Sequence, residues 1–213
     1  MTPEAFIEAH TAIGRPALVP EISLHLATEI TPIWQATEIW LARQGIEPPF
    51  WAFAWPGSIA LARMVLDRPE RVAGLRVLDF AAGCGLAGIA AAQAGAALVE
   101  ACEIDPLAVA ATGLNAALNG VAVTALLGDV VGAACRWDVI LAGDICYEAP
   151  MARHIMPWLQ AMAGQGAMVL IADPGRAYFS ATGGLEIARS SVPTTRELED
   201  CSVREVVIVQ ILP

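Results

Sequence analysis

The sequence predicts a doubly wound α/β domain with a mainly parallel sheet of seven strands, preceded by a helical extension. Short apolar runs alternate with helix-like segments from Arg76 onward, which is the pattern of parallel strands joined by helices. The run over Trp137–Ala142 is uninterrupted, as expected for a strand that is buried on both faces. A chain of 213 residues with 56% hydrophobic and 16% charged residues can bury one large core, so disorder and coiled-coil arrays are excluded.

The N-terminal region is predicted to be helical. Pro48-Pro49 ends this region, and further prolines divide it. We therefore expect residues 1–56 to form a helical extension and residues 57–213 to form the α/β domain, within one compact unit. The helix-like segments cover Pro3–Ala12, Glu21–Thr31 and Pro32–Gln44.

The α/β domain is predicted from residue 57 onward. A helix with an apolar face, over Gly57–Leu66, leads through a polar connection to the first strand. In doubly wound folds the ligand lies at the carboxyl ends of the strands. Strands are expected over Arg76–Phe80, Leu98–Glu103, Val121–Leu127, Trp137–Ala142, Ala167–Ala172, Leu185–Ser190 and Val203–Leu212. Helices are expected over Leu86–Ala94, Pro106–Asn119 and Met151–Gly164.

Charge and cysteine content exclude several classes of function. All twelve basic residues are arginines, and 22 acidic residues give a net charge of −10, which is opposite to the electrostatics of a nucleic-acid binder. An acidic surface favours a cationic partner, although solubility alone also accounts for it. Five widely spaced cysteines without a C-x-x-C pair argue against a disulfide framework and a zinc site, so no metal is expected.

One uncharged stretch is long enough on paper to cross a membrane. Phe80–Val99 has no charged residue, but it is mostly Ala and Gly, and its paired glycines indicate a turn. We interpret it as a buried strand, a turn and a helix, and we expect no membrane partner. The N-terminus has no secretory pattern, and Glu4 and Glu8 disfavour a mitochondrial presequence, so a cytoplasmic location is expected.

The strongest chemical signal is a carboxylate followed by a glycine-rich turn. The strand Arg76–Phe80 contains Asp79 near its end, and Gly83 and Gly85 follow at positions where a backbone must approach a ligand or adopt positive φ. Glu103 closes the next strand, 24 residues after Asp79. An acid at about this distance accepts hydrogen bonds from ribose hydroxyls in nucleoside-binding α/β folds.

Two nucleoside ligands compete for this pattern. The glycines also match G-x-G-x-x-G, with Gly88 as the third, which by itself is weak evidence for a dinucleotide. Asp79 would repel a pyrophosphate but suits the ammonium of an amino-acid moiety, as in S-adenosylmethionine. Asp129, after the third strand, could accept a hydrogen bond from an adenine amino group. The structural alternative is that these acids cap the helices that follow them.

With these residues the chain resembles the seven-stranded, class I S-adenosylmethionine-dependent methyltransferases. Within this class it resembles the electron transfer flavoprotein β-subunit lysine methyltransferase family, over about residues 45–213. The glycine turn reads Ala81-Ala82-Gly83 where many relatives have another glycine, which alters the turn. The absence of a presequence suggests a bacterial counterpart. Three segments are specific to the resemblance, namely Trp55-Pro56-Gly57, Gly143-Asp144-x-x-Tyr147 and Asp173-Pro174-Gly175-Arg176.

The resemblance implies roles for individual residues. S-adenosylmethionine is the implied cofactor, with Trp55 in a lid over it, and a protein lysine, on the flavoprotein β-subunit, is the implied substrate. Asp144 could anchor the incoming ammonium by a charge-assisted hydrogen bond, and Tyr147 could offer a ring face and a hydroxyl. Arg176 should face the same crevice, either touching substrate or in a structural ion pair. Class I enzymes of this size are often monomers.

Alternatives stay open at this point. Asp144 could instead cap the helix near Met151. The lysine proton could go to water or to a carboxylate. The function could also be methylation of a small amine such as nicotinamide, or docking by a non-catalytic module with the same fold.

Overall fold

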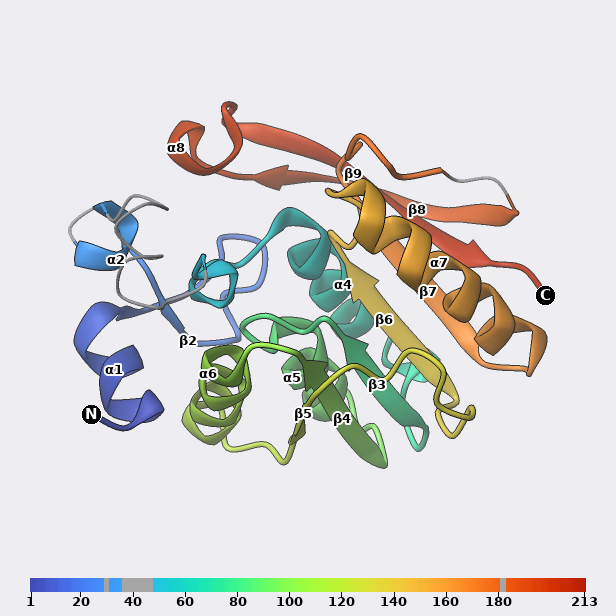
Figure 1. Ribbon diagram of the computed structural model, residues 1–213, viewed down its shortest axis with the longest axis horizontal. Coiled ribbons are helices and arrows are strands. Elements are labelled where there is room, and N and C mark those ends of the chain that lie inside the picture. Colours follow the sequence, from blue (N-terminus) through green and yellow to red (C-terminus); the bar gives the residue numbers. More distant parts are fainter. Residues whose placement is uncertain (29–30, 36–47, 181–182) are drawn as a thin grey trace.

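Seven strands form one sheet in the order β5-β4-β3-β6-β7-β9-β8, which confirms the predicted fold class (Figure 1). The computed structural model describes residues 1–28, 31–35, 48–180 and 183–213. The first five strands along this order are parallel, whereas β9 is antiparallel to both β7 and β8. The strands are β3 (Arg76–Phe80), β4 (Leu98–Glu103), β5 (Thr124–Leu127), β6 (Val139–Gly143), β7 (Met168–Asp173), β8 (Gly184–Pro193) and β9 (Val203–Ile211).

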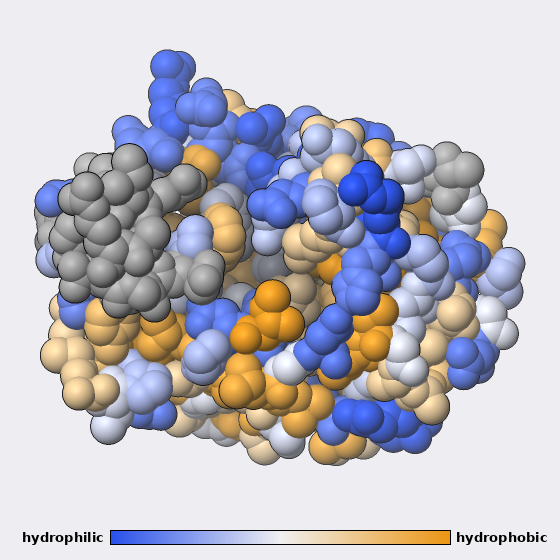
Figure 2. Space-filling model, in the orientation of Figure 1, coloured by the Kyte–Doolittle hydropathy of each residue, from blue (hydrophilic) through white to orange (hydrophobic). Residues whose placement is uncertain are grey.

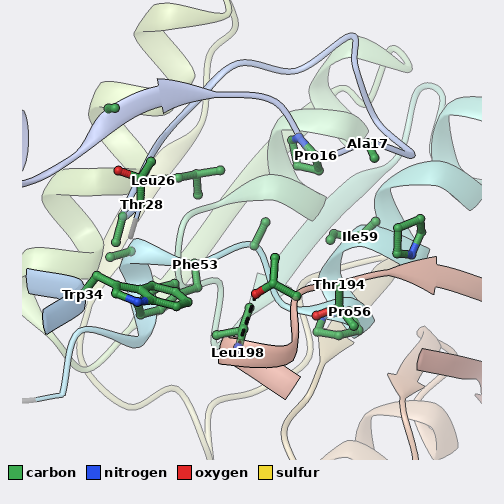
Figure 3. A pocket seen from close by; sticks show the side chains of 16 residues that line it. Pro16, Ala17, Leu26, Thr28, Trp34, Phe53, Pro56, Ile59, Thr194 and Leu198 are labelled. Carbon is green, nitrogen blue, oxygen red and sulfur yellow. Dashed lines mark hydrogen bonds between the residues drawn. The ribbon is translucent and has the colours of Figure 1, made fainter. Parts of the chain in front are cut away.

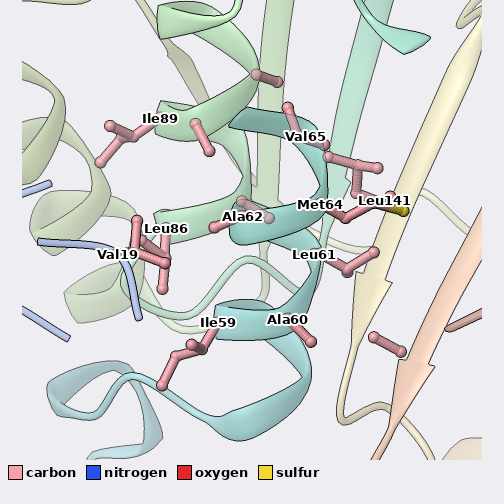
Figure 4. Close-up of a cluster of buried hydrophobic side chains, with 14 of the residues drawn as sticks. Val19, Ile59, Ala60, Leu61, Ala62, Met64, Val65, Leu86, Ile89 and Leu141 are labelled. Atoms are coloured by element: carbon pink, nitrogen blue, oxygen red, sulfur yellow. The ribbon is translucent and has the colours of Figure 1, made fainter. Parts of the chain in front are cut away.

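Helices cover both faces of the sheet and enclose two buried clusters. Alternate residues of β6 enter opposite clusters, Val139 and Leu141 on one face and Ile140 and Ala142 on the other, as the uninterrupted apolar run predicts. On the first face α4 packs against α5, and both rest on the sheet (Figure 4). The opposite face is covered by α7. The helices of the domain are α4 (Pro56–Asp67), α5 (Leu86–Gln93), α6 (Pro106–Leu118), α7 (Ala149–Gly164) and α8 (Arg196–Glu199), with the 3₁₀ turn η2 (Pro69–Arg71).

The N-terminal extension differs from the prediction. The helix α1 (Pro3–His10) agrees with it, but the described part of Glu21–Thr31 is not helical and instead contains β2 (Leu24–Leu26), paired antiparallel with β1 (Ala12–Gly14). Of the predicted helix Pro32–Gln44, the structure describes only α2 (Pro32–Gln35), and residues 36–47 lie outside the described residues. A 3₁₀ turn, η1 (Phe50–Ala52), then leads into α4.

Tertiary contacts explain why this segment is extended. The amide of Ser23 donates to Asn119 Oδ1 and that of His25 to Asn115 Oδ1, both on or next to α6. Ile22 and Leu24, which alternate along the chain with Ser23 and His25, are fully buried. Amides and apolar side chains therefore alternate with a period of two, which an extended chain satisfies and a helix does not.

The order in which the chain adds strands to the sheet reverses at β3. From β3 the chain proceeds to β4 on one side and later to β6 on the other, so the loops after β3 and β6 part from each other. This point of a doubly wound sheet is where a crevice forms at the carboxyl ends of the strands. Asp79 and Asp144 lie at the ends of these two strands.

Candidate active site

The turn after β3 leaves room for a ligand. Gly83 and Gly85 have φ of 56° and 77°, which a residue with a side chain rarely adopts. A Cβ on Gly85 would lie 2.8 Å from Thr112 Cγ2, so this glycine is needed for packing against α6. A Cβ on Gly83 would meet only Trp51 Cα, at 4.0 Å, so the backbone there borders open space. This cradle fits the close approach of a ligand that the sequence predicts.

Asp79 lies beneath the glycine turn and is hydrogen-bonded to the helix that follows it. Its side chain is buried and its Oδ2 accepts a hydrogen bond of 2.7 Å from the amide of Gly88, in the first turn of α5. Burial raises the pKa of Asp79 to about 8, against the opposing effect of this hydrogen bond. A Cβ on Gly88 would lie 3.1 Å from the carboxylate, so the third glycine lets helix and strand approach. Asp79 therefore bonds to the first turn of α5, although the residue at the N-cap of this helix is Gly85.

Glu103 closes β4 and bonds to two loop amides. Its Oε1 accepts from Gly83 N at 2.8 Å and its Oε2 accepts from Ile104 N at 3.0 Å. Burial raises the pKa of Glu103, and these hydrogen bonds oppose the rise. The side chain of Ile104 is 74% exposed beside this carboxylate. We did not predict a role for it, although an apolar residue directly after the acid was visible in the sequence.

Asp129 is more exposed than the other two acids. Its Oδ1 accepts from Val131 N at 2.8 Å, and its Oδ2 lies 2.7 Å from Nε2 of His154 on α7. Slight burial would raise the pKa of Asp129, but these hydrogen bonds lower it. No helix of the described chain begins here, so the capping alternative is wrong for this residue.

The structure brings the three acids to one edge of the sheet. Burial raises the pKa of the Cys102 thiol, on β4, to about 12, and the charges of Asp79, Glu103 and Asp129 add to the rise. Burial also raises the pKa of Tyr147, with a contribution from the charge of Glu103. The charge of Glu103, at the end of β4, therefore acts on Tyr147 in the segment after β6.

Asp144 follows β6 in a tightly packed turn. Its φ is 56°, and its carboxylate is buried. Oδ2 accepts from Gly57 N at 2.5 Å, and Oδ1 accepts from Nε and Nη2 of Arg176 at 3.1 and 2.7 Å. Burial raises the pKa of Asp144 to about 6, and Arg176 opposes the rise. The cap of α7 is Glu148, so the alternative that Asp144 caps this helix is wrong.

Glycines make this turn possible. A Cβ on Gly57 would lie 2.5 Å from Asp144 Oδ2 and 2.6 Å from the carbonyl oxygen of Ala172. A Cβ on Gly143 would lie 2.7 Å from the amide of Ser58. The Trp55-Pro56-Gly57 and Gly143-Asp144 segments can pack this closely because Gly57 and Gly143 have no side chains.

Aromatic rings connect Tyr147 to the N-terminal extension. The ring of Phe50 lies 5.7 Å from that of Tyr147 and 6.1 Å from that of Trp55. Trp55 also lies 5.7 Å from the guanidinium of Arg176, and its indole N–H donates to the carbonyl of Phe50. Trp55 therefore lies on the Asp144 side of the crevice, whereas Trp51 is the tryptophan next to Gly83.

A cavity of about 570 Å³ has Trp34 and Phe53 in its lining (Figure 3), and the ring of Phe53 lies 5.8 Å from that of Trp55. Its walls come from the β1–β2 hairpin, the segment before α4, and the connection between β8 and α8. Pro56 and Leu198 line it and directly precede Gly57 and Glu199, which contact Asp144 and Arg176. Hydrophobic side chains also gather beside a hollow near the centre of the face in Figure 2.

The described residues lack a metal-binding group and a membrane-spanning helix. They contain no group of three or more His, Cys, Asp or Glu side chains that could hold a metal ion. In the same residues, no helix has the length and apolar character needed to cross a bilayer.

Known proteins resemble this chain in sequence and in fold. The family described as "Ribosomal protein L11 methyltransferase (PrmA)" matches residues 60–172. The electron transfer flavoprotein beta subunit lysine methyltransferase of Xenopus laevis is 42% identical over 185 residues, covering 84% of this chain and 72% of that protein. The human protein of the same name is 36% identical over 182 residues, covering 83% and 68%.

A solved structure shows the same fold. Magnesium protoporphyrin IX methyltransferase from Synechocystis PCC 6803, with bound S-adenosylmethionine, has a TM-score of 0.54 at 16% identity and covers 72% of this chain and 77% of its own. The glycine turn and the acid-ended strands described above lie on this class I methyltransferase fold. The chain therefore belongs to the electron transfer flavoprotein β-subunit lysine methyltransferase family.

Proposed function

We propose that the chain transfers methyl groups from S-adenosylmethionine to lysine side chains of the β-subunit of electron transfer flavoprotein. One observation carries the proposal: β3 and β6 are neighbouring parallel strands, so the glycine turn with Glu103 lies at the same edge of the sheet as the Asp144–Tyr147 segment. The methyl donor and the acceptor lysine must bind next to each other, and this edge of the sheet brings the two candidate sites together. The names of the relatives support the protein substrate, since the chain covers about 70% of their length at 36–42% identity.

The β3–β4 edge suits the nucleoside part of the cofactor. When bound, S-adenosylmethionine would supply a methyl carbon to which the amine nitrogen bonds as the carbon–sulfur bond breaks, with the neutral thioether of S-adenosylhomocysteine as the leaving group. Gly83 and Gly85 let the backbone approach the cofactor, and Glu103 has lone pairs left for ribose hydroxyls. Ile104 offers an apolar face to adenine, and Asp129 can accept from its amino group.

Asp79 complements the charge of the amino-acid part. Its carboxylate lies buried beneath the glycine turn, where the bonded amide of Gly88 fixes it. A nearby ammonium stabilises the ionised carboxylate, so binding of a cationic ligand opposes the rise that burial causes in its pKa. The acid thereby favours a ligand with an ammonium group over one with a pyrophosphate.

The acceptor lysine is expected beside Asp144 and Tyr147. Displacement at a methyl group needs little acid–base chemistry, so holding the amine in line dominates catalysis. Asp144 can accept a hydrogen bond from the amine, and the 40% exposed ring of Tyr147 can pack against the aliphatic stem. Trp55 closes this side of the crevice next to Arg176.

Charge supports a protein partner. With a net charge of −10, the chain attracts a basic protein surface that carries a lysine and repels nucleic acid. We expect it to act as a monomer, as class I enzymes of this size often do.

Labelled S-adenosylmethionine and purified electron transfer flavoprotein test the proposal. We expect label on lysines of the β-subunit. Label on nicotinamide, with none on the flavoprotein, would instead support a small-amine methyltransferase, a reading that the relatives do not favour.

Asp144→Asn separates an enzyme from a docking module. The variant keeps an oxygen for Gly57 N but replaces the acceptor oxygen next to Arg176 with an NH2 group, so turnover should fall while S-adenosylhomocysteine still binds. Asp138→Asn is the matched control, since it removes a carboxylate that pairs with Arg76 on the exposed surface. Equal activity of both variants would contradict the assignment of Asp144.

A further inference from the structure

Arg176 is held between two carboxylates from different elements. Its Nε and Nη2 donate to Asp144 Oδ1, as described above, and on the other side Nη1 donates to Glu199 Oε2 at 3.1 Å and Nη2 to Oε1 at 2.5 Å. The guanidinium therefore has a forked hydrogen-bond arrangement toward each acid, which fixes both its position and its orientation.

Glu199 belongs to no motif of the sequence. It ends α8, the short helix between β8 and β9, and its side chain is 1% exposed. Thr195 caps this helix, and Arg204 of β9 donates to both the carboxylate and the backbone carbonyl of Glu199. Thr195 and Arg204 already hold α8 in place. The hydrogen bonds from Arg176 to the Glu199 carboxylate therefore serve to position Arg176.

The charges around Arg176 cancel. Asp144 and Glu199 carry two negative charges, and Arg176 and Arg204 carry two positive ones. Among the described residues, Asp173 adjoins the cluster through its Oδ1, which accepts from the amides of Gly175 and Arg176, and Cys146 and Tyr147 follow Asp144 in the chain. Burial raises the pKa of each of these three groups. The acceptor side of the crevice thus holds an acid whose charge is already balanced.

This balance matters for the reaction. A lysine in water has a pKa near 10.4 and is almost entirely an ammonium at neutral pH, whereas only the neutral amine is nucleophilic. A buried carboxylate without a counter-charge would stabilise the ammonium and reduce the neutral fraction tenfold for each unit by which it raises the lysine pKa. A carboxylate paired with a guanidinium still accepts a hydrogen bond but does not add this penalty.

We propose that Arg176, clamped by Glu199, is a positioning residue that cancels the charge of Asp144 so that the substrate lysine reacts as a neutral amine. The inference rests on the proposed function, because it requires a lysine to arrive beside Asp144. It assigns Arg176 to the acceptor site and Glu199 to the support of Arg176, and it changes the role of Asp144 from an anchor for an ammonium to a balanced hydrogen-bond acceptor.

The test is the pH dependence of single-turnover methyl transfer, measured for the wild type, Arg176→Gln, Arg176→Lys and Glu199→Gln. For Arg176→Gln we expect at least a tenfold loss of rate at pH 7.5, recovery toward the wild-type rate near pH 10, and no increase in the KM for the protein substrate. Arg176→Lys, which keeps a positive charge, should keep the wild-type pH profile. Glu199→Gln removes a negative charge from the cluster, so it should shift the profile toward lower pH, opposite to Arg176→Gln.

Several results would overturn the inference. If the neutral variants lose the same fraction of the rate at every pH, or if Arg176→Lys loses as much as Arg176→Gln, the cluster has only a structural role. Should Arg176→Gln fail to fold, the opposite shift expected for Glu199→Gln and the unchanged profile expected for Arg176→Lys still test the charge balance. The Asp138→Asn control should leave the profile unchanged. If the wild-type protein transfers no methyl group to the flavoprotein, that result contradicts the proposed function and not the role of Arg176.

Discussion

Gly57→Ala tests the packing that holds Asp144 at the end of β6. The new Cβ would lie 2.5 Å from Asp144 Oδ2, 2.6 Å from the carbonyl oxygen of Ala172 and 2.8 Å from Asp144 N. Two of these atoms belong to the backbone, which cannot move away as a flexible side chain can. The change would also break the hydrogen bond from Gly57 N to the carboxylate.

The structure sets the size of the effect. Overpacking costs about 1–3 kcal/mol, and loss of a hydrogen bond to a charged group costs about 1.5–3 kcal/mol. We therefore expect a loss of about 3 kcal/mol or more in the free energy of unfolding. For a chain of this length that corresponds to a fall of roughly 6–12 °C in Tm. Thermal unfolding and urea titration both measure it.

Gly113→Ala is the matched control. Gly113 lies inside α6, and a Cβ there would meet nothing within 4 Å. Alanine is favoured over glycine in a helix by about 1 kcal/mol, so this variant should be slightly more stable than the wild type. A Gly57→Ala protein with the same Tm as the wild type and full activity would refute the close packing of Gly57 on Asp144.

The other predictions concern the cofactor side. Glu103→Ala should weaken S-adenosylhomocysteine binding about 10–100-fold in calorimetry, since it removes charge-assisted hydrogen bonds; unchanged affinity would contradict the ribose role. The raised pKa of Asp79 means that the folded protein holds a proton that the unfolded chain releases near pH 4, so stability should fall as pH rises from about 4 to 8, and urea titrations of Asp79→Asn should show a shallower fall. An equally steep fall would exclude Asp79 as its source. His154→Gln should change stability by less than about 1 kcal/mol, because its pair with Asp129 is exposed.

Local sequence signals predicted the α/β domain well. Each strand from β3 to β9 lies where an apolar run had been expected, because buried strands of a doubly wound sheet are short, apolar and separated by turns. The glycine turn and the acids were predictable for the same reason, because they lie at or directly after the ends of predicted strands. The sequence also placed Asp144 beside Tyr147.

Long-range contacts were not predictable in this way. The extended segment around Leu24 depends on side chains of Asn115 and Asn119, more than 90 residues away. The partner of Arg176, Glu199, lies in a short helix without a motif, and nothing in the sequence links it to Asp144. Such pairs arise only when the fold brings distant elements together.

The most direct test of the account is a crystal structure with bound S-adenosylhomocysteine. We predict that the Glu103 carboxylate lies about 3 Å from the ribose hydroxyls, and that the sulfur faces the opening between Asp144 and Tyr147. A ligand bound elsewhere, or a Glu103 side chain turned away from the ribose, would contradict the idea that one edge of the sheet serves both donor and acceptor.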